Sequence, residues 1–346
     1  MKQNSYRLEI FCGTGGVGKT TLASSRATSL AIEGKRVLLI TIDPALRLKQ
    51  VFGLNETGAG NKSVVSVEHP ETKKEVTFDA LLMNPEETFK RLNIKQDKPN
   101  KILDILMRPN GGMNEIMAII EVQQHLEERQ YDTIVLDTPP GKHFIDFLNA
   151  SQKIDRFFDK NFVEVFKFFG KNLQKTTERF SSRKLVRRLV SSGVSKLLSY
   201  LEKVTGKEFV ETFVDAIFTL YNNKDQFIVA LKFQDYLKKS ESYRWYLVAS
   251  TEQQKVSEIV DLTGEASHIS KSSASLLINK CIGDHIANLD DSLSEENKVI
   301  QEYYLNREKE IIEFSRETDL FEEVKKFPES LSSDPLKHVF ELSKYW

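Results

Sequence analysis

Residues 13–21 read GTGGVGKTT and combine glycines, a lysine and hydroxyl side chains in an order that suits the phosphates of a nucleotide. Glycines let successive backbone N–H groups curl around phosphate oxygens, and the start of a helix adds partial positive charge. In this pattern the lysine bridges the β- and γ-phosphates, and the next hydroxyl ligates Mg²⁺. A glycine-rich turn that arose by chance is the alternative. The predicted nucleotide-binding residues are Gly13, Gly15, Gly16, Val17, Gly18, Lys19, Thr20 and Thr21.

Two aspartates follow apolar runs that read as strands. Asp137 ends the run TIVLD, and we predict that it forms the Mg²⁺ site together with Thr20. Asp43 ends the run VLLITID at the same sheet edge, and we predict that it acts with Lys19 in catalysis by orienting or deprotonating the attacking water. A strand-end cap is the alternative for Asp137, and a cap of the segment that begins at Pro44 is the alternative for Asp43.

The elements that must position these residues alternate between strand and helix. A helix-like run follows the glycine-rich segment and ends at Gly34, which gives a strand–helix–strand unit. Several strand candidates are near-continuous apolar runs, which are typical of parallel sheets covered on both faces. We predict an α/β fold, a doubly wound and mostly parallel sheet of the P-loop NTPase type with a large helical insertion. The predicted strands are residues 7–12, 36–43, 77–84, 131–137, 244–251, 273–280 and 321–328.

The predicted core consists of residues 1–84, 131–150 and 243–346, and a helical subdomain consists of residues 85–130 and 151–242. Residues 151–210 hold 14 Lys or Arg and 6 Asp or Glu, which gives a local charge of +8. Six phenylalanines crowd the start of this segment, and their exposure to water would be costly. The core of the insertion itself could cover them, or a groove shared with a second subunit or an apolar helix, while the basic residues suit either solvent or acidic lipid. The six are Phe157, Phe158, Phe162, Phe166, Phe168 and Phe169.

Composition excludes several classes of protein. The chain has 346 residues and a net charge of -1, so no global field favours nucleic acid or a membrane surface. No window approaches ~18 uninterrupted apolar residues, and the first strand pattern begins too early to leave space for a secretion signal. Two cysteines, Cys12 and Cys281, form no disulfide framework, so we predict a cytoplasmic protein. The six histidines show no cluster, and no structural metal is expected.

The motifs GTGGVGKTT, TIDPALRL, DTPPGKHFIDFL and LLINK, in this order, resemble those of the arsenical pump-driving ATPases and of their relatives that target tail-anchored membrane proteins. The resemblance implies a Mg²⁺-dependent ATPase that works as a homodimer with two facing sites for ATP. By motif match it implies that Asp43 is the catalytic aspartate of switch I and Asp137 the magnesium-linked aspartate before switch II. It also implies that Asn279 reads adenine and that Pro328 lies near the base.

Three departures from this family pattern stand out. Family members carry a lysine at the second loop position that reaches across the dimer, but Thr14 occupies it here, and Lys142 is a candidate replacement. Leu46 stands where switch I usually has a histidine. The Cys-x-x-Cys pair that binds zinc at the dimer seam is absent, as is the arsenite-binding cysteine cluster, so no structural zinc is expected.

We therefore expect an ATPase whose cycle changes the conformation of a helical region that binds a client. An apolar helical client or a membrane-associated partner suits the phenylalanine-rich segment, and no nucleic-acid partner is expected. Two alternatives stay open: a nucleotide-gated localisation switch that hydrolyses weakly, and a small-molecule kinase built on the same loop.

Overall fold

The computed structural model describes the chain in separate stretches, which are residues 7–42, 51–53, 59–69, 72–92, 100–106, 113–141, 143–145, 147–148, 203–223, 225, 227, 232–233, 236–237, 243–266, 274–287 and 295–346. Several predictions from the sequence lie outside these residues. They concern Asp43, Leu46, Lys142 and the six phenylalanines between residues 157 and 169.

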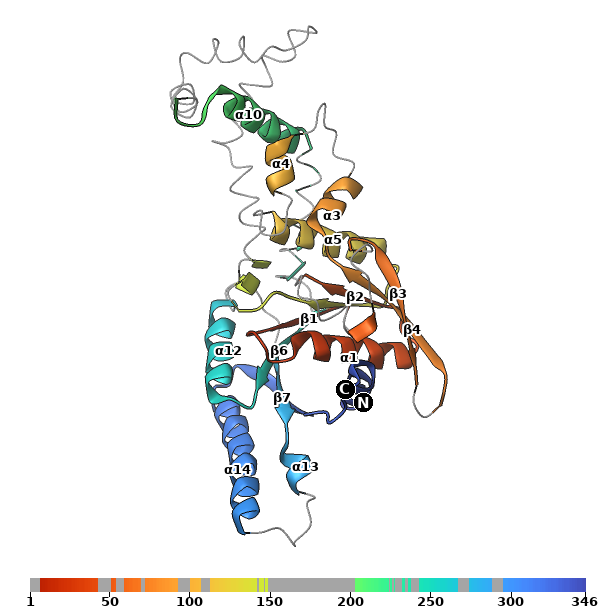
Figure 1. Ribbon diagram of the computed structural model, residues 1–346, viewed down its shortest axis with the longest axis vertical. Coiled ribbons are helices and arrows are strands. Elements are labelled where there is room, and N and C mark those ends of the chain that lie inside the picture. The colour runs from red at the N-terminus through yellow and green to blue at the C-terminus, as the bar shows by residue number, and fades with distance from the viewer. Residues whose placement is uncertain are drawn as a thin grey trace. The chain divides into compact units, whose positions relative to one another are not determined.

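The fold contains an eight-stranded sheet in the order β3-β4-β2-β5-β1-β6-β7-β8. Figure 1 shows this sheet, with β1, β2, β3, β4, β6 and β7 labelled. All neighbouring pairs are parallel except β3 and β4, which are antiparallel. The predicted α/β fold with a mostly parallel sheet is confirmed. The strands are β1 (Leu8–Gly13), β2 (Val37–Thr41), β3 (Lys62–Glu68), β4 (Glu75–Leu82), β5 (Thr133–Asp137), β6 (Tyr243–Ser250), β7 (Ala274–Cys281) and β8 (Phe321–Pro328).

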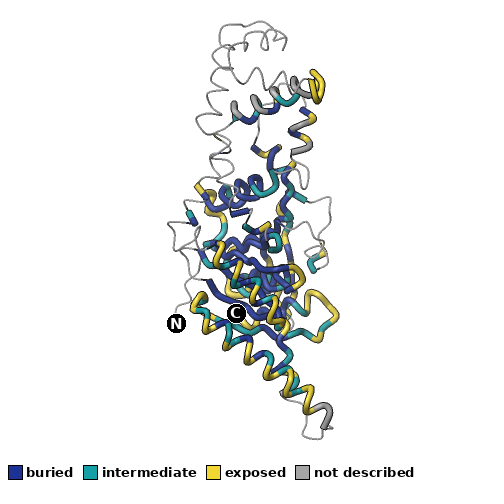
Figure 2. Tube along the Cα trace, turned by 90° about the vertical axis from the view of Figure 1, so that its left-hand side faces the viewer, coloured by how far each residue is buried: buried dark blue, intermediate teal, exposed yellow. Residues whose placement is uncertain are grey.

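Burial along the strands explains which of them the sequence predicts. Strands β1, β2 and β5 are buried at every position, as their continuous apolar runs require. In Figure 2 the buried residues, drawn in dark blue, gather where the trace is densest. Strand β3 was not predicted, because it lies at the edge of the sheet and buries only alternate side chains. Val65 and Val67 point into the core, whereas Val64 is 71% exposed.

The helices that the structure describes are α1 (Lys19–Ile32), α3 (Pro85–Arg91), α4 (Lys101–Leu106), α5 (Asn114–Glu128), α10 (Lys207–Asn222), α12 (Gln253–Ala266), α13 (Gly283–Ala287), α14 (Glu295–Glu317) and α15 (Pro335–Ser343). None of the helices within the described ranges is long and apolar enough to cross a membrane. Helices α1 and α15 pack side by side against the sheet, and their apolar residues share one core cluster with Phe11 and Val248.

Contacts divide the chain into two compact units. The first, which holds the whole sheet, consists of Met1–Asn84, Glu121–Asn149 and Phe233–Trp346. The second consists of Pro85–Ile120 and Ala150–Lys232. The elements described in the second unit are helices. There the side chain of Asn100, the residue before α4, donates a hydrogen bond of 2.9 Å to the Thr212 carbonyl on α10.

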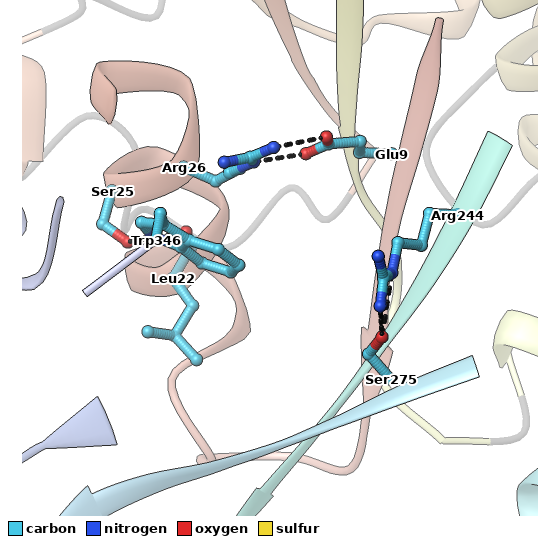
Figure 3. Close-up of polar contacts among 7 residues, drawn as sticks. All are labelled: Glu9, Leu22, Ser25, Arg26, Arg244, Ser275 and Trp346. Atoms are coloured by element: carbon cyan, nitrogen blue, oxygen red, sulfur yellow. Dashed lines mark hydrogen bonds and ion pairs between the residues drawn. The ribbon is translucent and has the colours of Figure 1, made fainter. Parts of the chain in front are cut away.

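A buried ion pair holds α1 against β1. The Arg26 guanidinium on α1 donates two hydrogen bonds, of 2.7 and 2.8 Å, to the two carboxylate oxygens of Glu9 on β1 (Figure 3). The two side chains are only 6% and 0% exposed. Burial alone would lower the pKa of Arg26, but the hydrogen bonds and charge of Glu9 raise it, so the pair stays ionised. Because both bonds are parallel, the pair fixes the orientation of α1 as well as its distance from β1.

Trp346 packs against the same helix. Its indole N–H donates a 2.8 Å hydrogen bond to the Ser25 hydroxyl, and the Arg26 guanidinium lies 5.3 Å from the ring centroid (Figure 3). The ring centroid of Phe327, on β8, lies 4.7 Å from that of Trp346. Helix α1 is therefore held by an ion pair to β1 and by an aromatic contact that extends to β8.

We expect Arg26→Ala to lower the free energy of unfolding by about 3–5 kcal/mol, because it leaves the Glu9 carboxylate buried without its partner. Arg36→Ala is the matched control, since Arg36 forms an exposed ion pair with Asp132 and should change stability little. Urea unfolding monitored by circular dichroism measures both variants. Similar losses in the two variants would contradict the structural role of the Glu9 pair.

Candidate functional site

The glycine-rich loop connects the end of β1 to the first turn of α1, as predicted. Gly18 stands at the helix start with a φ of 92°, a left-handed conformation that favours glycine. A side chain at Gly13 would place its Cβ only 2.3 Å from the Val248 carbonyl oxygen on β6. By contrast, no atom lies within 4 Å of a Cβ at Gly15 or Gly16, and both are exposed. The loop is thus packed tightly on β6 while its middle is open to an approaching phosphate group.

Lys19 lies folded against the loop. Its ammonium donates a 2.9 Å hydrogen bond to the Thr14 carbonyl, and only 7% of the residue is exposed. Thr14 is equally buried, and among the described residues its hydroxyl has no hydrogen-bond partner. On β1, burial raises the pKa of the Cys12 thiol, and the charge of Lys19 opposes part of that rise. Cys12 is therefore a neutral thiol in the core of β1.

The Asp137 carboxylate connects β5 to α1 and β2 through hydrogen bonds. Its Oδ2 atom accepts hydrogen bonds from the Thr20 hydroxyl on α1 at 2.7 Å and from the Thr41 hydroxyl on β2 at 2.9 Å. The aspartate itself ends β5 and is 1% exposed. Thr41 was not predicted from the sequence, although its place at the end of a strand beside β5 is a signal that could have identified it.

The chemistry of these side chains fits a magnesium site. Mg²⁺ prefers oxygen ligands and keeps several waters, so a hydroxyl and one carboxylate are a sufficient protein contribution when phosphate oxygens complete the shell. Thr20 and Asp137, which the sequence predicts as metal ligands, already lie in contact. Over the described parts of the chain, no group of three or more His, Cys, Asp or Glu residues could hold a metal ion.

The segment after Asp137 runs back to the loop. The Thr138 hydroxyl donates to the Phe11 carbonyl at 2.8 Å, and the Gly141 N–H donates to the Gly13 carbonyl at 3.0 Å. His143, which follows, is exposed. The DTPPG motif is therefore hydrogen-bonded to the end of β1. A displacement of this segment would shift or break the hydrogen bond to Gly13, the first glycine of the loop.

Asn279 and Pro328 lie near the carboxyl ends of the neighbouring strands β7 and β8. The Asn279 amide donates a 2.9 Å hydrogen bond to the Val17 carbonyl, so this side chain contacts the loop directly. Pro328 lines a cavity of about 430 Å³ beside α15, together with His285, Leu331 and Lys337 among others. The structure therefore brings Asn279 to the glycine-rich loop, whereas Pro328 faces a separate hollow.

Comparison with known proteins gives consistent matches. The profile of the family described as anion-transporting ATPase matches residues 6–316. The chain is 30% identical over 150 residues to "ATPase ASNA1 homolog 1" of Paramecium tetraurelia, which covers 43% of this chain and 44% of that protein. It is 27% identical over 214 residues to "ATPase GET3" of Malassezia globosa, covering 60% and 59% of the two chains. The match to "ATPase get3" of Schizosaccharomyces pombe is 26% identical over 166 residues and covers 46% and 48%. These matches span about half the length of the relatives.

We expect Gly13→Ala to lower the free energy of unfolding by about 1–3 kcal/mol, because the new methyl group must push the Val248 backbone away. Gly15→Ala is the matched control within the same loop, since its methyl group would meet nothing within 4 Å. Thermal unfolding of both variants tests this difference. Equal melting temperatures would show that the packing of the loop on β6 is not a constraint.

Proposed function

Since the chain belongs to the anion-transporting ATPase family, as its motifs predicted, we propose that it is a Mg²⁺-dependent enzyme that binds and hydrolyses ATP. The contact between Thr20 and Asp137 carries this proposal. It supplies a hydroxyl and a carboxylate at the base of an open glycine loop, which is the arrangement that P-loop enzymes need for a phosphate-bound Mg²⁺. A fold without this contact would support nucleotide binding alone.

Each residue of the site has a role in this proposal. The exposed backbone of Gly15 and Gly16 receives the phosphate oxygens, and Lys19 exchanges its hydrogen bond to the Thr14 carbonyl for bonds to the β- and γ-phosphates. Thr20 and Asp137 would hold Mg²⁺, which when bound would neutralise charge on the phosphates. Asp43 orients or deprotonates the attacking water, a role that rests on the sequence.

We further propose that hydrolysis is coupled to the helical regions at residues 85–130 and 151–242, in a cytoplasmic homodimer. Hydrogen bonds from the DTPPG segment to the end of β1 support the idea that the site senses the state of its phosphates. The composition of residues 151–210 supports an apolar helical client or a membrane-associated partner. Client capture and dimer formation are measured separately from hydrolysis.

One observation favours a second function, a weakly hydrolysing switch that is gated by nucleotide. Thr14 is neutral and 7% exposed, so its side chain offers no charge to the phosphates of a second subunit. Fixed positive charge near the developing negative charge accelerates such reactions, typically by two to three orders of magnitude per donor. A protein without the crossing lysine would bind ATP normally and turn it over slowly.

Lys19→Ala and Asp43→Asn separate binding from turnover. We expect Lys19→Ala to weaken binding of Mg²⁺–ATP at least about tenfold, because the phosphates lose their main cation. Asp43→Asn should keep the affinity and lower turnover by about 10²–10⁴-fold, the usual contribution of a general base. Calorimetry and phosphate release measure the two quantities. An equal loss of affinity in both variants would contradict the proposed roles.

Thr14→Lys tests the weakly hydrolysing alternative. We expect slow turnover in the natural protein and at least a tenfold rise in Thr14→Lys, which grows with protein concentration because the new charge must reach a second subunit. Thr14→Ser, which stays small and neutral, is the control and should match the natural protein. Rapid hydrolysis by dilute natural protein that does not change in Thr14→Lys would exclude the weak switch.

A further inference from the structure

Asn279 touches the phosphate-binding loop at the junction where it becomes helix α1. Its amide nitrogen lies 2.9 Å from the Val17 carbonyl oxygen, to which it donates a hydrogen bond. The same nitrogen lies 2.2 Å from the position that a Cβ would take at Gly18. The side chain is 5% exposed, so both contacts are shielded from water. The asparagine thus lies against two consecutive residues of the loop, Val17 and Gly18.

The first contact has a consequence for the backbone. The peptide bond between Val17 and Gly18 is planar and trans, so its C=O and N–H groups point in opposite directions. A carbonyl held by Asn279 therefore turns the Gly18 N–H away from β7. This N–H belongs to the set at the start of α1 that can donate to a phosphate. Its direction matters because a misaligned donor loses most of its hydrogen-bond strength.

Asn279 is itself held firmly. It pairs with Ser250 at the end of β6, and the chain just beyond it is fixed by Glu308 on α14. This buried carboxylate accepts hydrogen bonds from the backbone N–H groups of Ile282 and Gly283, at 2.7 and 2.8 Å. The register with β8 is interrupted between Ile278 and Cys281, so the end of β7 is held by β6 on one side and by Glu308 just beyond it, and these contacts support the Asn279 amide.

We propose that Asn279 is a positioning residue for the phosphate-binding loop, which acts through the Val17 carbonyl to aim the Gly18 N–H at the phosphates. This inference rests on the proposed nucleotide-binding function. It differs from the recognition of adenine that the family resemblance implies for the same residue. A residue that aims the loop affects every ligand with the same phosphates, whereas a residue that reads the base affects ATP alone.

The test compares ligands that share a triphosphate but differ in the base. Dissociation constants for Mg²⁺ complexes of ATP, GTP and inorganic triphosphate are measured by calorimetry on the natural chain, Asn279→Ala and Asn279→Asp. The aspartate variant keeps the size of the side chain but replaces the donor with a carboxylate that repels the Val17 carbonyl. Asn306→Ala, an exposed change on α14, is the control and should bind all three ligands like the natural protein.

We expect Asn279→Ala to weaken the binding of all three ligands by the same factor, about tenfold. Asn279→Asp should weaken their binding more. Melting temperatures close to that of the natural protein would show that the loss is local. A loss confined to ATP, with GTP and triphosphate unchanged, would overturn the inference and leave the proposed function standing. Failure of the natural protein to bind any of the three would overturn the proposed function and this inference with it.

Discussion

The buried ion pair between Arg26 and Glu9 is the constraint on which the site depends. It sets where α1 lies relative to β1, and the glycine loop is the short connection between these two elements. Burial of two charges is costly, and a pair of this kind often stabilises a protein no better than apolar side chains would. Its value here is geometric, because a bidentate pair permits one orientation where an apolar contact would permit several.

A fixed α1 has consequences on the other side of the loop. The Thr20 hydroxyl can reach Asp137 only if the first turn of α1 faces the end of β5, and Thr41 on β2 meets the same carboxylate oxygen. Side chains from α1, β2 and the distant strand β5 thus meet at one carboxylate. Because parallel strands end at a common edge, small shifts of any one strand would separate these groups. The tight contact of Gly13 with β6 restrains the remaining freedom of the loop.

The sequence predicts the parallel strands and the loop well, because continuous apolar runs and the glycine spacing are local signals. It does not predict β3, whose alternate burial leaves Val64 in solvent and resembles the pattern of a loop. It also does not predict the partner of Glu9 or the meeting of Thr41 with Asp137. These contacts join residues from separate elements, and no local pattern encodes which side chains will face each other across a sheet or from helix to strand.

Residue 14 lies within the same packing. The Lys19 ammonium already donates a hydrogen bond to the Thr14 carbonyl, and both residues are only 7% exposed. A second ammonium turned inward here would lose its hydration and repel the first, which strongly disfavours its charged form. A lysine at residue 14 would therefore have to turn outward, whereas threonine fits the buried space. Within the described residues, the loop holds one ammonium group, so any second positive charge at the proposed phosphate site would come from another segment.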